Sequence, residues 1–493
     1  MDILAGIATL FGDPMAVAAV VLGAVIGVIV GAIPGLTTAA AISLMVPLTF
    51  YIPPLPALAF LYVVGKSGRF GGSISAILFN TPGTAASAAT MIDGHPLVRQ
   101  GKAGKAMKTA AVSSVIGDFG GDLILIFGVA LIARYTERLG PPEYFAAYLM
   151  AFVLIGSMIG SSILKGLISS VAGVVLGIVG LDPISAMPRL TFGSYELEGG
   201  FSLVPIMIGV FVLSEVFVRA EEREQGAPEV IPATGSPSRD DHRLTLPEFL
   251  SCLPVILRST GIGAAIGLLP GIGSAVACFI AYGEEKRRAP DSHSWGSGNI
   301  KGIAAPESAN NAVSGPSMIP LLALGIPGST IAAILVSVFL IHGITVGPAI
   351  FHQDRDLIFG LFAAGLFGIA IYGLIGFFAG PLVGRFVALL PASRIYPLVF
   401  LTAFIAAYSA RNSMLDVLAM ACFGLLGYAM KKFDFSPAAL IISFVLTRGA
   451  EESLRQAMLI SDNGPLIFLE RPFAIGCFAV TVILLYLRLR RRG

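Results

Sequence analysis

The sequence contains one unusual phrase twice: GAIPGLTTA at residues 31–39 and GLLPGIGSA at residues 267–275. Each copy is a Pro-Gly break inside an apolar stretch. A second pair of breaks lies downstream, at Pro82-Gly83-Thr84 and at Pro327-Gly328-Ser329. A break frees backbone polar groups, and inside a bilayer such backbone is tolerated only where it is buried in protein or lines a cavity. Paired breaks in two halves of a chain are typical of a transporter binding site.

The composition places the chain in a membrane. Its 493 residues are 55% hydrophobic and 13% charged, and the mean hydropathy is +0.85. Soluble proteins carry about 25% charged residues. The net charge is only +2, so nothing indicates a nucleic-acid partner. The composition therefore predicts a polytopic protein whose main partner is the lipid bilayer.

The apolar runs predict an all-α fold. Each span needs about 20 residues, so the chain has room for about 12 transmembrane helices besides broken or re-entrant hairpins. The first 13 residues lack a basic stretch, and we expect no cleaved signal peptide. The last helix ends in a basic tail at 488–492, which predicts a cytoplasmic C-terminus.

The repeat extends beyond the two phrases. Three glycines spaced by four, at 27, 31 and 35, recur 236 positions later, and such spacing lets helices approach closely. The second break recurs after 245 positions, and Asp182 matches Asp434 after 252. Short insertions explain the drift. We interpret residues 1–220 and 248–470 as membrane repeats, joined by a polar linker at 221–247 and followed by a last transmembrane helix and tail at 471–493.

Loop charges indicate how the repeats are oriented. The loop after the first phrase is uncharged, whereas the loop after its copy contains Lys286, Arg287 and Arg288. The loop after the Pro82 break has four basic residues between 99 and 108, whereas its counterpart at 354–356 has two aspartates and one arginine. Basic loops stay on the cytoplasmic side, so the repeats are predicted to have inverted topology.

The broken segments are the candidate substrate site. A half-helix that begins after a break presents N–H groups and a positive dipole end, which favour an anion. Two such ends suit a small carboxylate. The alternative is ordinary kinked helices packed through Gly and Pro. The candidate residues are Pro34, Gly35, Ser73, Ser75, Asn80, Thr81, Pro82, Gly83, Thr84, Pro270, Gly271, Pro327, Gly328, Ser329 and Thr330.

A polar cluster at 304–320 is the candidate ion site. Glu307, Asn310 and Asn311 are spaced by three and four, which places them on one helix face. A carboxylate with side-chain carbonyls suits Na⁺ or a proton relay. The alternative is a polar re-entrant loop held by its own hydrogen bonds.

Four charges inside apolar sequence form an uncertain charged site. Asp118 and Asp122 share a face of a helix that we expect to start near residue 107. Acids at such depth are costly and are usually paired or functional. Lys66 and Arg69 are the candidate partners, although these two bases could instead meet a substrate carboxylate.

No signal indicates an enzyme. The five histidines have no metal-binding spacing, and the four cysteines are scattered through apolar sequence. The run at 261–267 has the wrong glycine spacing for a dinucleotide site and lacks a βαβ context. No Walker A sequence is present. We expect no cofactor and no metal, only a coupling cation, Na⁺ or H⁺.

Several long motifs resemble one family. They are GGSISAILFNTPGTAASAATMIDG at 71–94, GKAGKA at 101–106, GPPEYFA at 140–146, GIAAPESANNAVSGPSMIPLLALGIPGS at 302–329 and GAEESLRQAMLIS at 449–461, together with the two opening phrases. These motifs resemble the large membrane subunit of tripartite tricarboxylate transporters, the TctA family. The resemblance covers nearly the whole chain.

The resemblance implies a multi-pass transporter of the bacterial inner membrane. It implies a small membrane subunit and a periplasmic substrate-binding protein as partners, and ion-coupled uptake of a citrate-like carboxylate. It places the site at the two hairpins and the polar cluster. Family members commonly have small or aromatic residues where this chain has Lys66 and Arg69, so no role is carried over to these. An elevator-type motion is an analogy at the level of fold.

Two questions stay open from the sequence. A channel or facilitator for small organic anions, without ion coupling, is the alternative function. The Gly-rich helices could pack within one protomer or between two copies, so a homodimer is one alternative arrangement.

Overall fold

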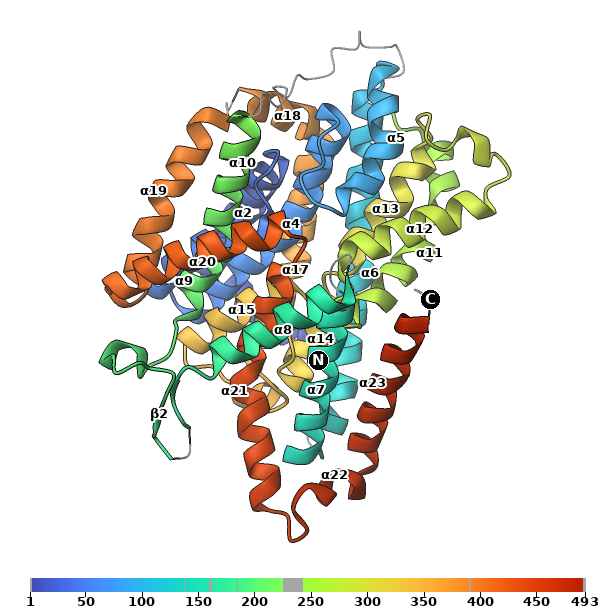
Figure 1. The fold of residues 1–493 in the computed structure, drawn as a ribbon. Coiled ribbons are helices and arrows are strands. Elements are labelled where there is room, and N and C mark those ends of the chain that lie inside the picture. The colour runs from blue at the N-terminus through green and yellow to red at the C-terminus, as the bar shows by residue number, and fades with distance from the viewer. Residues whose placement is uncertain are drawn as a thin grey trace.

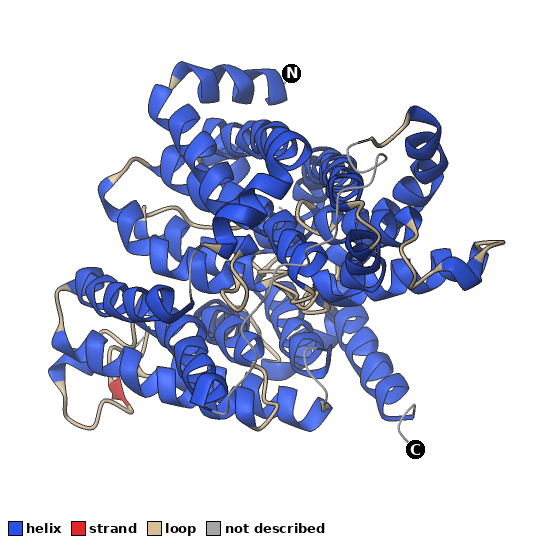
Figure 2. Ribbon diagram, turned by 90° about the horizontal axis from the view of Figure 1, so that it is seen from above, coloured by secondary structure: helices blue, strands red, loops and turns tan. Residues whose placement is uncertain are grey.

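The computed structural model describes residues 2–136, 138–158, 162–183, 185–224, 243–389 and 392–490. It is built almost entirely of helices (Figures 1 and 2), which confirms the predicted all-α fold. Within these ranges the only strands are β1 (Gly180–Leu181) and β2 (Pro188–Arg189), which form one antiparallel pair. Residues 225–242 of the predicted linker and 491–493 of the predicted tail lie outside the described residues.

The described helices fall on either side of the predicted linker. Those before it are α1 (Asp2–Gly12), α2 (Pro14–Ala32), α3 (Thr38–Met45), α4 (Pro54–Phe79), α5 (Ser87–Arg99), α6 (Ala103–Thr136), α7 (Pro141–Met158), α8 (Ile163–Gly177), α9 (Leu203–Met207) and α10 (Ser214–Glu224). Those after it are α11 (Leu246–Gly267), α12 (Gly273–Arg288), α13 (Ile300–Ala312), α14 (Ile319–Leu324), α15 (Thr330–Ile341), α16 (Ile350–Gln353), α17 (Arg355–Leu374), α18 (Gly380–Ala388), α19 (Ala392–Arg411), α20 (Met414–Lys432), α21 (Pro437–Leu459), α22 (Ile467–Glu470) and α23 (Pro472–Arg490).

Local sequence signals explain where key helices begin and end. Asp13 caps α2 by accepting a hydrogen bond from the amide of Met15 at 2.9 Å. α2 ends at Ala32 because the next residue precedes a proline and is extended, with φ −75° and ψ 115°. α11 begins with a capping box between Thr245 and Glu248.

The described helices fit a multi-pass membrane protein. Six segments are long and apolar enough to cross a membrane: Pro14–Ala32, Ala103–Val129, Leu203–Glu222, Leu246–Gly267, Arg355–Ala388 and Met414–Lys432. A helix pair at 464–483, bent by 87°, would make a seventh if it counts as one span. Five other apolar helices have only 10–17 residues, fewer than the roughly 20 that a span needs. The count of about 12 spans stays a prediction.

The long helix α6 shows the reversed polarity of a membrane helix. Its apolar side chains Phe119, Leu123, Phe127 and Leu131 follow one face at intervals of four, and they are 36–73% exposed. Its acids at 118 and 122 are buried on another face. Such an exposed apolar face is suited to contact with lipid, whereas the face with the acids is turned toward the protein interior.

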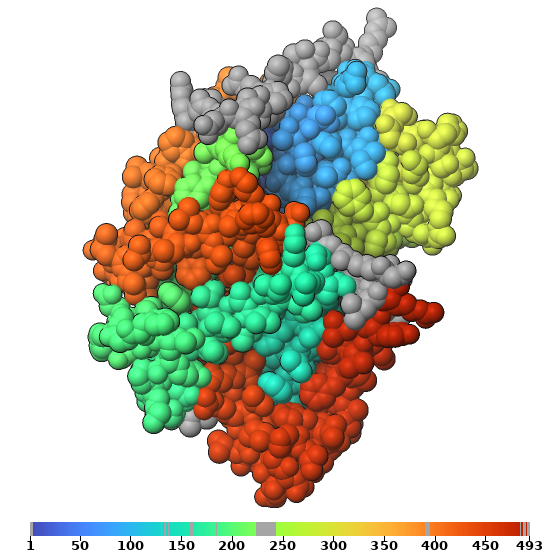
Figure 3. Space-filling view, in the orientation of Figure 1, coloured from blue at the N-terminus to red at the C-terminus, as the bar shows by residue number. Residues whose placement is uncertain are grey.

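The two halves of the chain are interleaved. α4 packs against α2, α5 and α17, and α13 packs against α11, α12, α5 and α6. In the space-filling view the blue segment that includes α5 lies directly against the yellow-green segment that includes α12 (Figure 3). Residues from both halves therefore meet along α4, α6 and α13, where the buried polar side chains gather.

Glycines allow the closest helix contacts. A Cβ on Gly31 of α2 would overlap the carbonyl of Gly68 on α4. A Cβ on Gly263 of α11 would likewise overlap the carbonyl of Ala309 on α13. The turns after these two helices are alike as well, because Gly35 and Gly271 both have φ +84°, a backbone conformation that favours glycine.

Candidate functional site

The candidate charged site lies in the middle of two long helices. Lys66 and Arg69 are on α4, and Asp118 and Asp122 are on α6. The structure corrects the predicted start of α6, which begins at Ala103 rather than near residue 107. Asp118 is therefore about 22 Å from the start of the helix, at 1.5 Å per residue. This depth leaves the acids no access to solvent along the helix.

Lys66 bridges the two aspartates. Its Nζ lies 2.7 Å from Oδ1 of Asp118 and 2.8 Å from Oδ1 of Asp122. The Lys66 and Asp118 side chains are fully buried, and that of Asp122 is 2% exposed. Nζ also lies 3.5 Å from the hydroxyl of Ser314 and 4.9 Å from the centre of the Tyr62 ring. The predicted pairing with Lys66 is therefore present, and the ammonium is fully engaged.

Two tyrosines complete this network. The Tyr372 hydroxyl on α17 donates to Oδ2 of Asp118 at 2.9 Å. The Tyr62 hydroxyl on α4 donates to Oδ1 of Asp122 at a longer 3.4 Å. Oδ2 of Asp122 has no hydrogen-bond partner among the described residues. The two acids therefore differ: both oxygens of Asp118 are satisfied, but only one oxygen of Asp122 is.

Arg69 has a different environment from Lys66. It forms no ion pair with any described residue, and its one hydrogen bond runs from Nη1 to the backbone carbonyl of Asn310 at 3.3 Å. Its Nε is buried without a partner within the described ranges, and the residue is 9% exposed. A guanidinium has five N–H donors. Arg69 therefore has donors left for a ligand, whereas Lys66 has none to spare.

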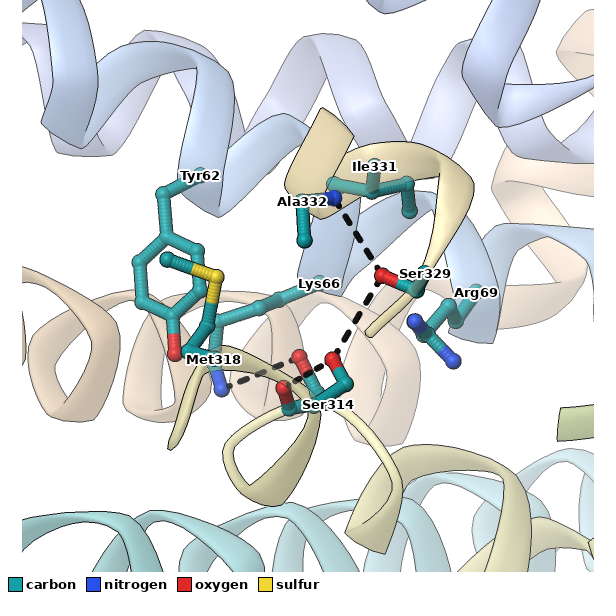
Figure 4. Close-up of a pocket in the computed structure, with 10 residues that line it drawn as sticks. Tyr62, Lys66, Arg69, Ser314, Met318, Ser329, Ile331 and Ala332 are labelled. Carbon is teal, nitrogen blue, oxygen red and sulfur yellow. Dashed lines mark hydrogen bonds between the residues drawn. The ribbon is translucent and has the colours of Figure 1, made fainter. Parts of the chain in front are cut away.

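A small cavity adjoins these bases (Figure 4). It has room for about one water molecule. Its lining comes from α4, from the segment 314–318 and from the start of α15: Tyr62, Gly65, Lys66, Arg69, Ser314, Ser317, Met318, Ser329, Ile331 and Ala332. Figure 4 shows Arg69 on the side of Ser329, with the Lys66 amine directed toward Ser314.

The second hairpin supplies the helix end beside Arg69. Ser329 caps α15, because its Oγ accepts a hydrogen bond from the amide of Ala332 at 3.2 Å. Its hydroxyl also lies 3.5 Å from that of Ser317. Pro327 and Gly328 set the turn immediately before, with Thr330 as the first residue of the helix. The positive end of α15 and the Arg69 guanidinium thus border the same cavity.

Glu307 occupies a cage of hydroxyl groups. It is fully buried and accepts hydrogen bonds from Ser73 at 2.5 Å, from Ser114 at 2.8 Å and from Thr90. These three donors are on α4, α6 and α5, so one carboxylate of the second half ties together three helices of the first. Neither Lys66 nor Arg69 forms a hydrogen bond or ion pair with this cage.

Buried amides lie next to Glu307 on α13. The Asn311 amide donates to the Glu307 carbonyl at 3.0 Å. Among the described residues, neither polar side-chain atom of Asn310 has a hydrogen-bond partner, and Oδ1 of Asn311 lacks one too. Buried polar groups without partners are costly, so these amides mark a place for water or a ligand. The helix face predicted for Glu307, Asn310 and Asn311 is present in α13.

The first hairpin packs against α4 instead of lining the cavity. The Gly83 amide donates to the Gly72 carbonyl at 3.3 Å, and Thr84 shares hydrogen bonds with Ser87. Ser75 bonds the carbonyl of Gly72 in its own helix at 3.0 Å. Asn80 ends α4 in the left-handed conformation, with φ 55°, and its side chain is exposed. Thr81 and Pro82 are partly buried. The α5 helix begins only at residue 87, later than the predicted half-helix start.

The two opening turns also lie outside the cavity. The Pro34 carbonyl accepts a hydrogen bond from the Tyr396 hydroxyl at 3.1 Å. The turn formed by Pro270 and Gly271 contacts the second hairpin, because the Gly271 amide donates to the Gly328 carbonyl at 3.2 Å. These turns therefore shape the surroundings of the site.

Several residues of the site escaped the sequence reasoning. Ser114 and Tyr62 lie four positions before Asp118 and Lys66, so helix spacing could have found both. Thr90 belongs to α5 and Tyr372 to α17. Their pairing with the acids gives no local signal, because it depends on helices that are distant in sequence.

One family model matches most of the chain, and two uncharacterised proteins are similar to it. Residues 17–442 match the tripartite tricarboxylate transporter TctA family. An uncharacterised 52.8 kDa protein of Agrobacterium vitis, from the TAR-I ttuC' 3' region, is 34% identical over 451 residues, covering 90% of this chain and 88% of the relative. A second uncharacterised protein of that organism, from the TAR-II ttuC' 3' region, is 37% identical over 227 residues, covering 45% of this chain and 93% of the relative. No solved structure matches.

The match spans both hairpins, the hydroxyl cage and the charged site. Such membership implies a transport protein with several membrane helices, which the described helices support. The chain therefore belongs to the tripartite tricarboxylate transporter TctA family.

Proposed function

We propose that this protein imports a small organic carboxylate by cation symport, as the large membrane subunit of a tripartite transporter. The observation that carries the proposal is Arg69. It is a buried guanidinium without a carboxylate partner among the described residues, and it borders a cavity beside the start of α15. A planar fork of donors matches a carboxylate, and a helix N-terminus favours an anion at the same place.

The buried charges favour ion coupling over simple diffusion. Lys66 and Arg69 carry two positive charges, whereas Asp118, Asp122 and Glu307 carry three negative charges when ionised. The five together have a net charge of −1 before any substrate enters. Net charge is costly in a low-dielectric interior. An incoming carboxylate therefore binds more favourably together with Na⁺ or H⁺, which distinguishes a symporter from a facilitator.

The proposed setting follows the family. The partners would be a small membrane subunit and a periplasmic protein that captures the carboxylate, in a bacterial inner membrane. The membership supports this arrangement. The substrate class is tricarboxylate or a related small acid, since a helix end, a guanidinium and several hydroxyls are general donors for carboxylate and hydroxyl groups.

Reciprocal contacts support two repeats that are related by a two-fold axis. Gly117 of α6 lies against Ser308 of α13. Gly368 of α17 lies against Val63 of α4. Gly368 follows Gly117 by 251 positions. Val63 precedes Ser308 by 245 positions. Each half thus places an equivalent glycine on an equivalent helix of the other half. A two-fold relation between the halves produces this reciprocity, and repeats in transporters have such a relation whether they are inverted or parallel. The charges of matched loops are what favour the inverted orientation.

The repeats differ at their first turns, which suggests two alternating states. At the first turn of the first half, Arg219 from that half and Tyr396 from the second half lie over Gly35. Their counterparts at the shifts of 236 and 252 are Arg455 and Tyr144. Arg455 instead bonds Glu451 and Asp182, and Tyr144 donates to the Thr136 carbonyl at 3.3 Å. In the alternative state, the counterparts would cover the second turn.

The first test is transport. The chain, reconstituted with its small partner and binding protein, is given labelled citrate and other di- and tricarboxylates under imposed Na⁺ or H⁺ gradients. We expect accumulation above equilibrium with one gradient. Equilibration that is indifferent to both gradients would support the facilitator and refute the symporter.

The second test addresses the site. Arg69→Gln should raise the apparent KM at least tenfold, because a charge-assisted hydrogen bond contributes about 1.5–3 kcal/mol. Asn80→Gly, at an exposed position of the other hairpin where glycine keeps the positive φ, is the control and should change KM by less than about twofold. Equal effects of both substitutions would argue against the Arg69 site.

The third test addresses the two states. Cysteine pairs at Pro34 with Tyr396 and at Pro270 with Tyr144 should both form disulfides during turnover. Each should arrest transport, and formation of one should prevent the other. Failure of the second pair to form, while the first forms, would refute the exchange of contacts.

A further inference from the structure

Three buried carboxyl groups on α6 and α13 are the candidates for a coupling proton, and their hydrogen bonds distinguish them. Glu307 accepts from three hydroxyls, which suits an ionised carboxylate. Asp118 accepts from Lys66 on one oxygen and from Tyr372 on the other. Asp122 accepts from Lys66 and Tyr62 on Oδ1 alone. Its Oδ2 has no partner among the described residues, although the residue is only 1% exposed.

Two glycines lie close to the Asp122 carboxyl group. A Cβ on Gly365 of α17 would lie 3.0 Å from Oδ2 of Asp122. A Cβ on Gly315 would lie 2.8 Å from Oδ1. A side chain at either place would crowd the carboxyl group, so glycine at both places keeps room for it. An ionised oxygen without a hydrogen-bond donor is costly at this buried position, and a proton on that oxygen removes its charge.

The Lys66 ammonium already occupies the position between the two aspartates where a free cation would bind. The Lys66 ammonium lies between the two aspartates, with the Ser314 hydroxyl and the Tyr62 ring around it. One positive charge then faces two negative charges. The Lys66 ammonium would repel a metal cation beside it. A proton on Asp122 instead leaves one carboxylate, that of Asp118, paired with one ammonium.

We propose that Asp122 is the site that binds the coupling proton, through protonation of Oδ2. The proton binds from the side with the higher proton concentration, converts the carboxylate to the acid, and leaves on the other side after the substrate site has changed access. This inference rests on the proposed symport and names its ion.

Lys66 links this site to the substrate cavity. It lines the cavity and bonds Asp122, and Arg69 is three positions further along the same helix. Protonation of Asp122 weakens its bond to the ammonium and leaves Lys66 a donor for a carboxylate in the cavity, so protonation and anion binding favour each other, as linkage requires. The charged and titratable groups around Asp122 are Lys66, Tyr62, Asp118, Tyr372 and, one helical turn away, Arg69.

Infrared difference spectroscopy tests the protonation without any substrate. Spectra of the full chain in lipid, taken between about pH 8 and pH 5, report the carbonyl stretch of newly formed carboxylic acids. We expect one such band, which Asp122→Asn removes and Glu307→Gln keeps. Loss of the band in Glu307→Gln and its persistence in Asp122→Asn would overturn the proposal. Thermal unfolding of each variant shows that it is folded.

Transport then separates this inference from the proposed function. With citrate as the probe in the complete complex, Asp122→Asn should exchange labelled for unlabelled substrate at a rate independent of pH. It should no longer accumulate substrate under a pH gradient. Retained pH-driven accumulation, or accumulation in the wild type driven only by Na⁺, would overturn the proton site and leave the symporter standing. No uptake of any carboxylate by the wild-type complex would instead refute the proposed function.

Discussion

Lys66 and Arg69 are neighbouring bases on α4, and the structure predicts opposite consequences for their removal. Lys66→Met takes the only ammonium from two carboxylates that lie 2.7 and 2.8 Å from it. Arg69→Met takes a guanidinium that has a single hydrogen bond, at 3.3 Å, to a backbone carbonyl. The first change leaves buried charge unpaired. The second removes a buried charge that forms no ion pair with any described residue.

The magnitudes follow from these distances. The two Oδ1 atoms of Asp118 and Asp122 are no further apart than the sum of their distances to Nζ, 5.5 Å. At an effective dielectric of about 20, two like charges at that separation repel by roughly 3 kcal/mol. Removing one partner of a buried pair typically costs about 3–5 kcal/mol. We therefore expect Lys66→Met to lower the unfolding free energy by about 3 kcal/mol or more.

For Arg69→Met the expected loss is smaller. One hydrogen bond from a charged group contributes about 1.5–3 kcal/mol, and removal of a buried charge that has no ion-pair partner offsets part of it. Charge that is retained without a stabilising partner indicates a functional demand, since active sites commonly sacrifice stability. Arg69→Met should therefore stay folded and lose carboxylate affinity.

The assay is thermal unfolding of the detergent-solubilised chain, read by fluorescence, together with a double-mutant cycle. Adding Asp122→Asn to Lys66→Met should recover a large part of the lost stability, because it removes the like charge. Equal destabilisation by Lys66→Met and Arg69→Met would refute the reasoning. It would mean that Arg69 has a structural role as strong as that of Lys66.

Three further predictions concern packing, the hydroxyl cage and the first hairpin. Gly31→Val should prevent stable folding, because its side chain would overlap the carbonyl of Gly68, whereas Gly12→Ala, with open space around it, should leave the yield of folded protein unchanged. Glu307→Ala leaves three buried hydroxyls without their acceptor and should lower the unfolding temperature more than Glu307→Gln, measured in the same detergent. Asn80→Ala should cost about 1–2 kcal/mol because of its positive φ, and Asn80→Gly should avoid that cost, measured by thermal unfolding.

The sequence alone was enough for the broad class of protein. Composition and apolar length predict a helical membrane protein, because a bilayer admits few other structures. The recurring phrase located both tight turns, since the bonding limits of proline and the freedom of glycine act locally. Helix spacing likewise put Asp118 and Asp122 on one buried face.

The sequence is less informative about the site itself. Lys66 and Arg69 are equal candidates for a contact with a substrate carboxylate, and both hairpins are candidates for the substrate site. In the structure, only Ser329 of the hairpin residues lines the cavity with the two bases. The predicted start of α6 is also later than the observed start at Ala103. The first turns of α6 are polar, and no strong capping residue marks where the helix begins.

What the sequence by itself determined is therefore the set of chemical groups and their local geometry: the turns, the helix faces and the depth of the acids. What only the tertiary structure decided is which groups are satisfied. Lys66 is engaged because α6 brings two acids to it, and Arg69 is left over because α13 offers it only a carbonyl. Partnership depends on helices that are far apart in sequence but packed together, and no local pattern encodes that contact.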